Sequence, residues 1–369
     1  MLEIGMTEMK EELMAFLLDK LKGDKSDTLS RWASPFMWGA PGVGKTDMCR
    51  GLQQEVSAAL GTDVTLMTLI ASQLDPVDWR GIPWQVDQNG EQRTDWLPPT
   101  FLPSGDVPTI MFLDELPQAP VESRRPLFGA LLGQELGGWK VPANTAFIAA
   151  GNPAEWAPNT EPMETPLLSR FAHYSVQSPT ADEWISWAHE SDIYPAIVGY
   201  VSLHRDQLYS MRPDATEQDV GSTPRSLEFL STRLRHMADD GNVNRAAAAH
   251  CGPTWADRFH IWHTKLIEVS EPEAYLDGSA KLSTDLGTMT LEVTSVSLHV
   301  MSTLVRSQSA PKGQIPLIKS YTDFLHSNMQ ERRELARASL VMALPKKFRP
   351  MAMGMAGYAN LMGSQEGLA

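Results

Sequence analysis

Residues 36–46 read Phe-Met-Trp-Gly-Ala-Pro-Gly-Val-Gly-Lys-Thr, and the rest of the chain is best understood around them. Residues 39–46 match the pattern G-x-x-x-x-G-K-[ST] at every fixed position. The apolar residues before the pattern predict a buried strand, and residues 47–60 after it are compatible with a helix. Glycines in such a turn let backbone N–H groups face phosphate oxygens, and the helix dipole adds to the attraction. The stretch therefore predicts a binding site for a nucleoside triphosphate; the alternative is a chance glycine turn before a helix.

This pattern gives its two polar side chains separate roles. Lys45 is predicted to reach the β- and γ-phosphates, and Thr46 is predicted to hold Mg²⁺. We therefore expect ATP and Mg²⁺ as cofactors. The residues predicted to bind the cofactor are Gly39, Ala40, Pro41, Gly42, Val43, Gly44, Lys45, Thr46 and Asp47.

Composition and charge narrow the class of protein. The chain has 369 residues, of which 42% are hydrophobic and 21% charged, as in an ordinary soluble globular protein. A formal net charge of −14 argues against a broad nucleic-acid footprint, because phosphate contacts need Lys and Arg. The only two cysteines, Cys49 and Cys251, are too few for a multi-cysteine zinc site. Residues 7–22 indicate an amphipathic helix rather than a signal peptide, and no apolar run is long enough for a membrane helix. A cytoplasmic location is expected.

The first half of the chain alternates between strand and helix patterns. Such alternation is typical of a doubly wound α/β domain, whose ligand binds at the carboxyl ends of the strands. Residues 121–132 are predicted to form one helix, and residues 82–96 a β-hairpin that turns at Asn89-Gly90. Besides the strand at 36–38, apolar runs predict strands at residues 64–69, 109–113, 145–150 and 172–176.

The pattern becomes helical after Pro179. From residue 181 to about 237 the apolar spacing is that of helices, and further helices are predicted at 255–269, 289–304, 317–328 and 332–342. We therefore expect a nucleotide-binding domain at residues 1–179, a smaller helical lid domain at 180–250 and a helical C-terminal extension at 251–369.

Two polar positions follow predicted strands of the first domain. Asp114 and Glu115 end the run 109–113, and Asn152 follows the run 145–150. Asp114 is suited to hold Mg²⁺ and Glu115 to activate the attacking water. The amide of Asn152 could bind the γ-phosphate or orient that water without repelling it. The alternatives are an acidic strand end that arises by chance and a turn residue before Pro153.

Two arginines are candidates for sensing the nucleotide. Arg170 could place a planar guanidinium group on the γ-phosphate of a neighbouring subunit. Arg225 opens a helix of the second domain and could couple the nucleotide state to the angle between domains. A surface salt bridge explains each equally well. Arg124 and Arg125, on the helix after the acidic pair, compete with Arg170 or lie on a solvated helix face.

Taken together, these stretches resemble a known family. In chain order, GAPGVGKT, IMFLDEL, AAGNP, LLSRF and TPRS are similar to the Walker A, Walker B, sensor 1, arginine finger and sensor 2 motifs of AAA+ ATPases. The segment VDWRGIP, the hairpin before Walker B and the Ser-Arg-Phe at the finger resemble the MoxR branch, which includes CbbQ/NorQ and cobaltochelatase small-subunit-like proteins. The motifs span about residues 30–235. The resemblance implies a P-loop AAA+ doubly wound parallel sheet with an all-helical lid.

The family's roles apply here only at matching positions. The resemblance implies that Lys45 and Thr46 bind phosphate and Mg²⁺, that Asp114 holds the metal and that Glu115 polarises water. Asn152, Arg170 and Arg225 would be sensor 1, the finger acting in trans and sensor 2. Members of the family form homo-oligomeric rings, usually hexamers. They commonly act with a von Willebrand A-domain partner on a protein client.

Three functions therefore remain open from the sequence. The first is an ATP-driven ring that remodels or activates a protein client. The second is a motor or clamp on nucleic acid, against which the acidic balance counts. The third is a scaffold that binds nucleotide only to assemble, although such a protein has no need of Glu115 or Arg170.

Overall fold

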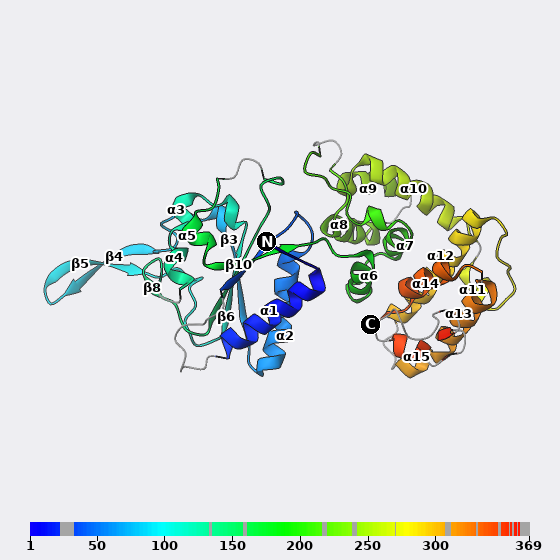
Figure 1. The fold of residues 1–369 in the computed structure, drawn as a ribbon, viewed down its shortest axis with the longest axis horizontal. Coiled ribbons are helices and arrows are strands. Elements are labelled where there is room, and N and C mark those ends of the chain that lie inside the picture. Colours follow the sequence, from blue (N-terminus) through cyan, green and yellow to red (C-terminus); the bar gives the residue numbers. More distant parts are fainter. Residues whose placement is uncertain are drawn as a thin grey trace. The chain divides into compact units, whose positions relative to one another are not determined.

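The structure, a computed structural model, describes most of the chain as two compact units. They are Met1–Ser178 and Pro179–Ala369, coloured from blue to green and from green to red in Figure 1. The described residues are 1–22, 33–132, 135–157, 161–215, 220–237, 242–269, 271–306, 311–329, 331–345, 348–353, 355, 358–359 and 361.

The first unit is built on a parallel sheet of six strands in the order β1-β10-β2-β9-β6-β3. The predicted α/β fold with a doubly wound parallel sheet is confirmed, and so are its five predicted strands. The edge strand β1 was not predicted, because three residues are too few to show a pattern. The strands are β1 (Leu2–Ile4), β2 (Ser34–Trp38), β3 (Thr65–Ile70), β6 (Thr109–Asp114), β9 (Thr145–Gly151) and β10 (Phe171–Val176).

Both faces of this sheet are covered, which explains why its strands read as continuous apolar runs. In β6, Ile110 and Phe112 pack in the core beneath α1 (Met6–Leu21) and α2 (Lys45–Leu60). The residues between and after them, Met111 and Leu113, belong to the core on the other face, which also holds Phe36, Trp79, Leu116 and Leu127. A strand with alternate residues in two cores has no polar side.

The second face is covered by short elements rather than by one long helix. The predicted helix over residues 121–132 is wrong: the structure has α3 (Val121–Arg124) and α4 (Leu127–Ala130). Pro126 stands between them and lacks the N–H group that a continuous helix needs. The 3₁₀ turns η1 (Ala71–Gln73) and η2 (Leu116–Gln118) and the short helix α5 (Thr165–Leu168) complete this face.

Two hairpins extend from the first unit. The predicted hairpin is confirmed as β4 (Ile82–Gln88) and β5 (Glu91–Leu97), which project from the sheet in Figure 1. A second, shorter one pairs β7 (Glu135–Leu136) with β8 (Trp139–Lys140). Its turn residue Gly137 has a φ of 64°, and a Cβ there would lie 1.9 Å from the carbonyl oxygen of Trp79. Only glycine fits, because another side chain would collide with that backbone.

The described part of the second unit is helical. The helices predicted at 255–269, 289–304, 317–328 and 332–342 correspond to α10 (Pro253–Ile267), α12 (Leu286–Arg306), α13 (Ile315–Asn328) and α14 (Arg333–Ala343). The elements are α6 (Ala181–Glu190), α7 (Pro195–Leu203), η3 (Arg205–Gln207), α8 (Pro224–Arg235), α9 (Val243–Cys251), α10 (Pro253–Ile267), α11 (Pro272–Leu276), α12 (Leu286–Arg306), η5 (Pro311–Gln314), α13 (Ile315–Asn328), α14 (Arg333–Ala343) and α15 (Arg349–Met353).

Helices from both sides of residue 250 share a core in this unit. Ile197, Leu230 and Ala247 pack in one cluster with Phe259 and Met301. A second cluster lies among α12, α13 and α14. The division at residue 250 remains a prediction. None of the described helices is both long and apolar enough to cross a membrane.

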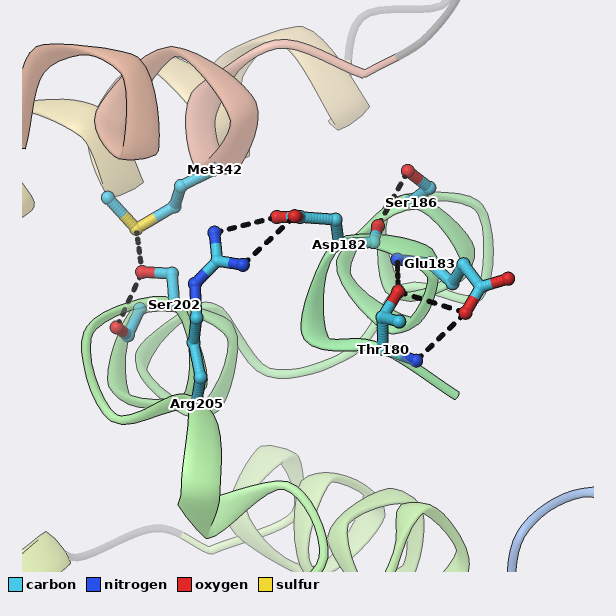
Figure 2. A network of polar contacts seen from close by, with 8 residues as sticks. Thr180, Asp182, Glu183, Ser186, Ser202, Arg205 and Met342 are labelled. Atoms are coloured by element: carbon cyan, nitrogen blue, oxygen red, sulfur yellow. Dashed lines mark hydrogen bonds and ion pairs between the residues drawn. The ribbon is translucent and has the colours of Figure 1, made fainter. Parts of the chain in front are cut away.

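Polar contacts fix the start of the helical unit (Figure 2). Thr180 caps α6: its hydroxyl oxygen accepts a hydrogen bond from the backbone N–H of Glu183, and its own backbone N–H donates to the Glu183 carboxylate. Arg205 of η3 forms a bidentate ion pair with Asp182, in which its two terminal nitrogens donate to the two carboxylate oxygens at 2.9 and 2.8 Å. This pair holds η3 against the first turn of α6.

His189 makes the stability of the second unit dependent on pH. Its Nε2 lies 2.6 Å from the carbonyl oxygen of Met342. Burial lowers its pKa to about 4; the charge of Arg349 also lowers it, and the Met342 contact opposes the shift. The unfolded chain therefore binds this proton below pH 6.5, whereas the folded chain binds it only below about pH 4.

We expect the free energy of unfolding to fall by up to about 3 kcal/mol on this account as pH drops through that window. Urea titrations across the pH range measure it. The variant His189→Gln, which keeps an N–H donor for Met342, should lose this part of the pH dependence, and the exposed His236→Gln should keep it. A wild-type pH profile that His189→Gln leaves unchanged would contradict the assignment.

Candidate nucleotide site

The loop between β2 and α2 has the geometry of a phosphate cradle. Gly42 and Gly44 have φ values of 76° and 108°, in the left-handed region that other residues rarely adopt. Gly44 is the N-cap of α2, which is 16 residues long. Because the first N–H groups of a helix have no partner within it, the start of α2 can donate to an anion.

Lys45, the first residue of α2, makes hydrogen bonds to the backbone of this loop. Its side chain is buried, and its Nζ donates hydrogen bonds to the carbonyl oxygens of Gly39, at 2.7 Å, and Ala40, at 3.0 Å. It also donates to Oδ1 of Asn152, at 3.2 Å. A bond from the backbone N–H of Gly39 to the carbonyl oxygen of Gly151, at 3.2 Å, joins the loop to the end of β9. The structure thus brings Asn152 beside Lys45, and its predicted role toward the γ-phosphate or the water stays a prediction.

Thr46 and Asp114 meet at the same edge of the sheet. The hydroxyl group of Thr46 donates to Oδ2 of Asp114, at 2.7 Å. A hydroxyl and a carboxylate are hard oxygen ligands, and Mg²⁺ usually takes one or two carboxylates together with substrate phosphates. The pair therefore fits Mg²⁺ in a nucleotide complex. Among the described residues, no group of three or more His, Cys, Asp and Glu could form a metal site of another kind.

Glu115 is held next to this pair by a residue that the sequence reasoning missed. Its Oε2 accepts a hydrogen bond of 2.5 Å from the hydroxyl group of Ser72 in η1. Glu115 itself has a φ of 55°, and its backbone N–H donates to Asp114 at 3.0 Å. Ser72 follows β3, and Asn152 follows β9. Both strands are neighbours of β6, so Ser72 and Asn152 lie on either side of Glu115 at the same edge of the sheet. A polar residue just after a strand is the signal that could have identified it.

The turn that carries Glu115 also packs against the strand that carries Asn152. Gly151 ends β9, and a Cβ there would lie 2.2 Å from Cδ of Pro117 in η2. Because Gly151 has no side chain, Pro117 can pack directly against the end of β9. The Glu115 turn and Asn152 are thereby held at a fixed spacing.

Arg170 lies at the opposite edge of the sheet. β10 runs parallel to β2, with Phe171 opposite Ser34 and Ser175 opposite Trp38. Trp38 leads into the phosphate loop, whereas Arg170 precedes Phe171 at the other end of the strand. Arg170 and the loop are therefore separated by the length of β10, about 13 Å or more. The Arg170 guanidinium group lies 5.2 Å from the ring centre of Phe128 and donates to the carbonyl oxygen of Pro166. Arg170 thus does not join the other predicted site residues of its own chain.

The competing arginines have different positions. Arg124 is fully buried, so it is not available to a neighbouring nucleotide, whereas Arg125 is exposed. Arg225 is exposed in the first turn of α8, in the second unit, and its role as a sensor remains a prediction. Trp79 is a core residue, packed edge-on against Phe101 at 5.7 Å.

Comparisons with known proteins give only remote similarity. No family model matches the chain, and no curated protein matches it. A solved structure of a Thermotoga maritima RuvB mutant is 14% identical, with a TM-score of 0.36 and coverage of 69% of each chain. PCH-2 from C. elegans is 11% identical, with a TM-score of 0.35, and the match covers 68% of this chain and 67% of that one.

A third similar structure is a complex of HORMA, CdnC and Trip13 from Escherichia coli MS115-1. It is 13% identical, with a TM-score of 0.39, and the match covers 68% of this chain and 87% of that one. Similarity at this level does not identify a function. The assignment of the site depends on the geometry described above.

Cys49, one turn beyond Lys45, provides a chemical test of how closely this site is packed. Burial raises the pKa of the Cys49 thiol, and the carboxylates of Asp114 and Asp47 raise it further. Burial also raises the pKa of Cys251 to about 12. The reactive thiolate form is therefore rare for both groups.

We expect neither cysteine to react with a maleimide in the native protein at about pH 8, and both to react once urea unfolds the chain. Mass spectrometry of labelled peptides distinguishes the two positions. Rapid native labelling of Cys49 would show that the core beneath the loop is open.

Proposed function

We propose that this chain is an ATP-hydrolysing AAA+ protein of the MoxR branch that forms a ring and remodels or activates a protein client. The observation that carries the proposal is the gathering of Lys45, Thr46, Asp114, Glu115 and Asn152 at one edge of a parallel sheet. These are the groups that phosphate binding, metal binding and water activation require. The acidic composition disfavours nucleic acid as the client.

In the proposed reaction, each residue of the site has a separate role. The N–H groups at the start of α2 and the Lys45 ammonium bind the phosphates, and Thr46 with Asp114 would hold Mg²⁺, which neutralises charge on the β- and γ-oxygens when bound. The Glu115 carboxylate takes a proton from the attacking water, whose oxygen forms a bond to the γ-phosphorus. The bond from that phosphorus to the bridging oxygen breaks, and ADP leaves. The Asn152 amide orients the water or the γ-phosphate.

The position of Arg170 supports an assembly with shared sites. A guanidinium group at the far edge of the sheet cannot serve its own loop, but it can serve the loop of an adjacent subunit. We therefore propose a homo-oligomeric ring, a hexamer, in which Arg170 acts in trans. A von Willebrand A-domain partner, a sensor role for Arg225 and a cytoplasmic location belong to the same proposal.

ATP turnover by the wild type and by Glu115→Gln tests this function. Removal of a general base should lower kcat about 100-fold or more while ATP binding is kept. Glu122→Gln, which neutralises an exposed carboxylate of α3, is the matched control and should turn over normally. Particle mass in ATP should correspond to a ring of several subunits for all three proteins.

Three results would contradict the proposal. Equal turnover by the wild type and Glu115→Gln would remove Glu115 from the mechanism. ATP-dependent assembly without turnover in any of the proteins would favour the nucleotide-gated scaffold. Salt-dependent binding of the wild type to DNA would instead favour the motor or clamp.

A further inference from the structure

Arg124 is a charged side chain that the proposed reaction does not use, yet it is fully buried. Its guanidinium group carries five N–H donors, and the structure gives it five acceptors. The acceptors are the carbonyl oxygens of Ala119 (2.8 Å), Pro162 (3.2 Å), Glu161 (3.2 Å) and Pro117 (3.4 Å) and the carboxylate of Glu164 (3.4 Å). A fully buried arginine with this many partners is more than a solvated helix residue.

These acceptors belong to two separate segments. Pro117 and Ala119 lie in the turn that directly follows Glu115. Residues 161–164 instead lead into α5, after which comes Arg170. Glu164 is the N-cap residue of α5, and its carbonyl oxygen accepts from Leu167 and Leu168 at 2.9 and 3.0 Å. Arg124 therefore joins the turn of the catalytic carboxylate to the helix that positions the finger.

A second set of contacts closes the connection. Phe128, on the helix that follows α3, lies under the guanidinium group of Arg170 at 5.2 Å. The Arg170 group also donates to the carbonyl oxygen of Pro166, within α5. The two contacts of Arg170 thus come from α4, which follows the helix of Arg124, and from α5, whose N-cap residue Glu164 binds Arg124. All of these residues lie in the first unit.

We propose that Arg124 is a positioning residue that joins the Glu115 turn and the Arg170 segment into one rigid piece. This inference rests on the proposed function, in which Glu115 serves the site of its own subunit and Arg170 serves the next one. A shift of the Glu115 turn at one site then moves the finger that completes the adjacent site. Lysine cannot replace Arg124, because an ammonium group has three donors and no planar fork.

A purely structural role for Arg124 predicts something different. In that case a substitution lowers the melting temperature, while the folded protein keeps its turnover. Coupling between two sites requires evidence from both of them, which a single variant does not supply. The test therefore needs kinetic constants and mixtures of subunits.

The first experiment compares Arg124→Lys with Arg93→Lys, which makes the same change at an exposed arginine of β5 in the same unit. Both are assayed well below their melting temperatures, after their ring mass has been measured. We expect Arg124→Lys to lower kcat about tenfold or more with KM for ATP within about twofold, since binding groups are untouched. Arg93→Lys should match the wild type. Equal kcat for the two variants would overturn the proposal.

The second experiment mixes subunits. Glu115→Gln mixed with Arg170→Ala should regain turnover, because an Arg170→Ala site can receive the finger of a Glu115→Gln neighbour. Arg124→Lys should regain much less with either partner, because both of its segments are displaced. Full recovery with Glu115→Gln would mean that Arg124 serves only the finger, and full recovery with Arg170→Ala that it serves only Glu115; each overturns the coupling.

A milder variant covers the case in which Arg124→Lys does not fold. Glu164→Gln removes the charge of one Arg124 partner but keeps an acceptor, so a smaller loss of kcat in the same direction is expected; an unchanged kcat would count against the proposal. Failure of the proposed function is distinct. It would appear as a wild type without turnover or as a reference mixture that regains nothing, whatever Arg124→Lys does.

Discussion

The buried ammonium group of Lys45 is the contact on which the arrangement of the site depends. It donates to the backbone of its own loop and to Asn152 at the end of the neighbouring strand. Burial of a charge is costly unless hydrogen bonds replace its water, and these oxygens do so. The loop is therefore closed around this cation. An anion at the start of α2 would be bound by that cation and by the helix dipole together.

The other polar groups of the site lie beside Lys45 in the order of the strands across the sheet. Asn152 follows β9, Asp114 ends β6 with Glu115 directly after it, and Ser72 follows β3; these three strands are neighbours. The site is assembled because parallel strands end at one edge. The same topology places Arg170 at the other edge, before β10 begins. A site that needs such a group must receive it from another subunit, and Arg124 provides a physical connection between the two edges within one chain.

Much of the fold could be predicted because the central strands are buried on both faces. Residues 109–113 read as a continuous apolar run for that reason, and Asn89-Gly90 identified its hairpin by local turn chemistry. Strand β1 was too short to show a pattern. The helix predicted over residues 121–132 failed at Pro126, where local backbone chemistry overrode the apolar spacing.

The candidate site was predictable to the same degree. Lys45, Thr46, Asp114 and Asn152 converge as expected, because each follows or ends a strand with a recognisable pattern. Ser72 was missed, since the sequence does not say that β3 lies beside β6. Arg124 was predicted to compete with Arg170 or to lie on a solvated helix face, because arginine is usually exposed. Its burial depends on residues 161–164, nearly forty positions away in the chain, and no local pattern reports such a contact.

Equilibrium binding of ATP with Mg²⁺ to the wild type and to Lys45→Ala tests the central claim most directly. Lys140→Ala, which removes an exposed lysine of the same unit, is the control. The wild type and Lys140→Ala should bind ATP with equal affinity, and Lys45→Ala should bind at least about tenfold more weakly, which is a loss of about 1.4 kcal/mol. Equal affinity of all three proteins would show that the loop at residues 39–46 is not the nucleotide site.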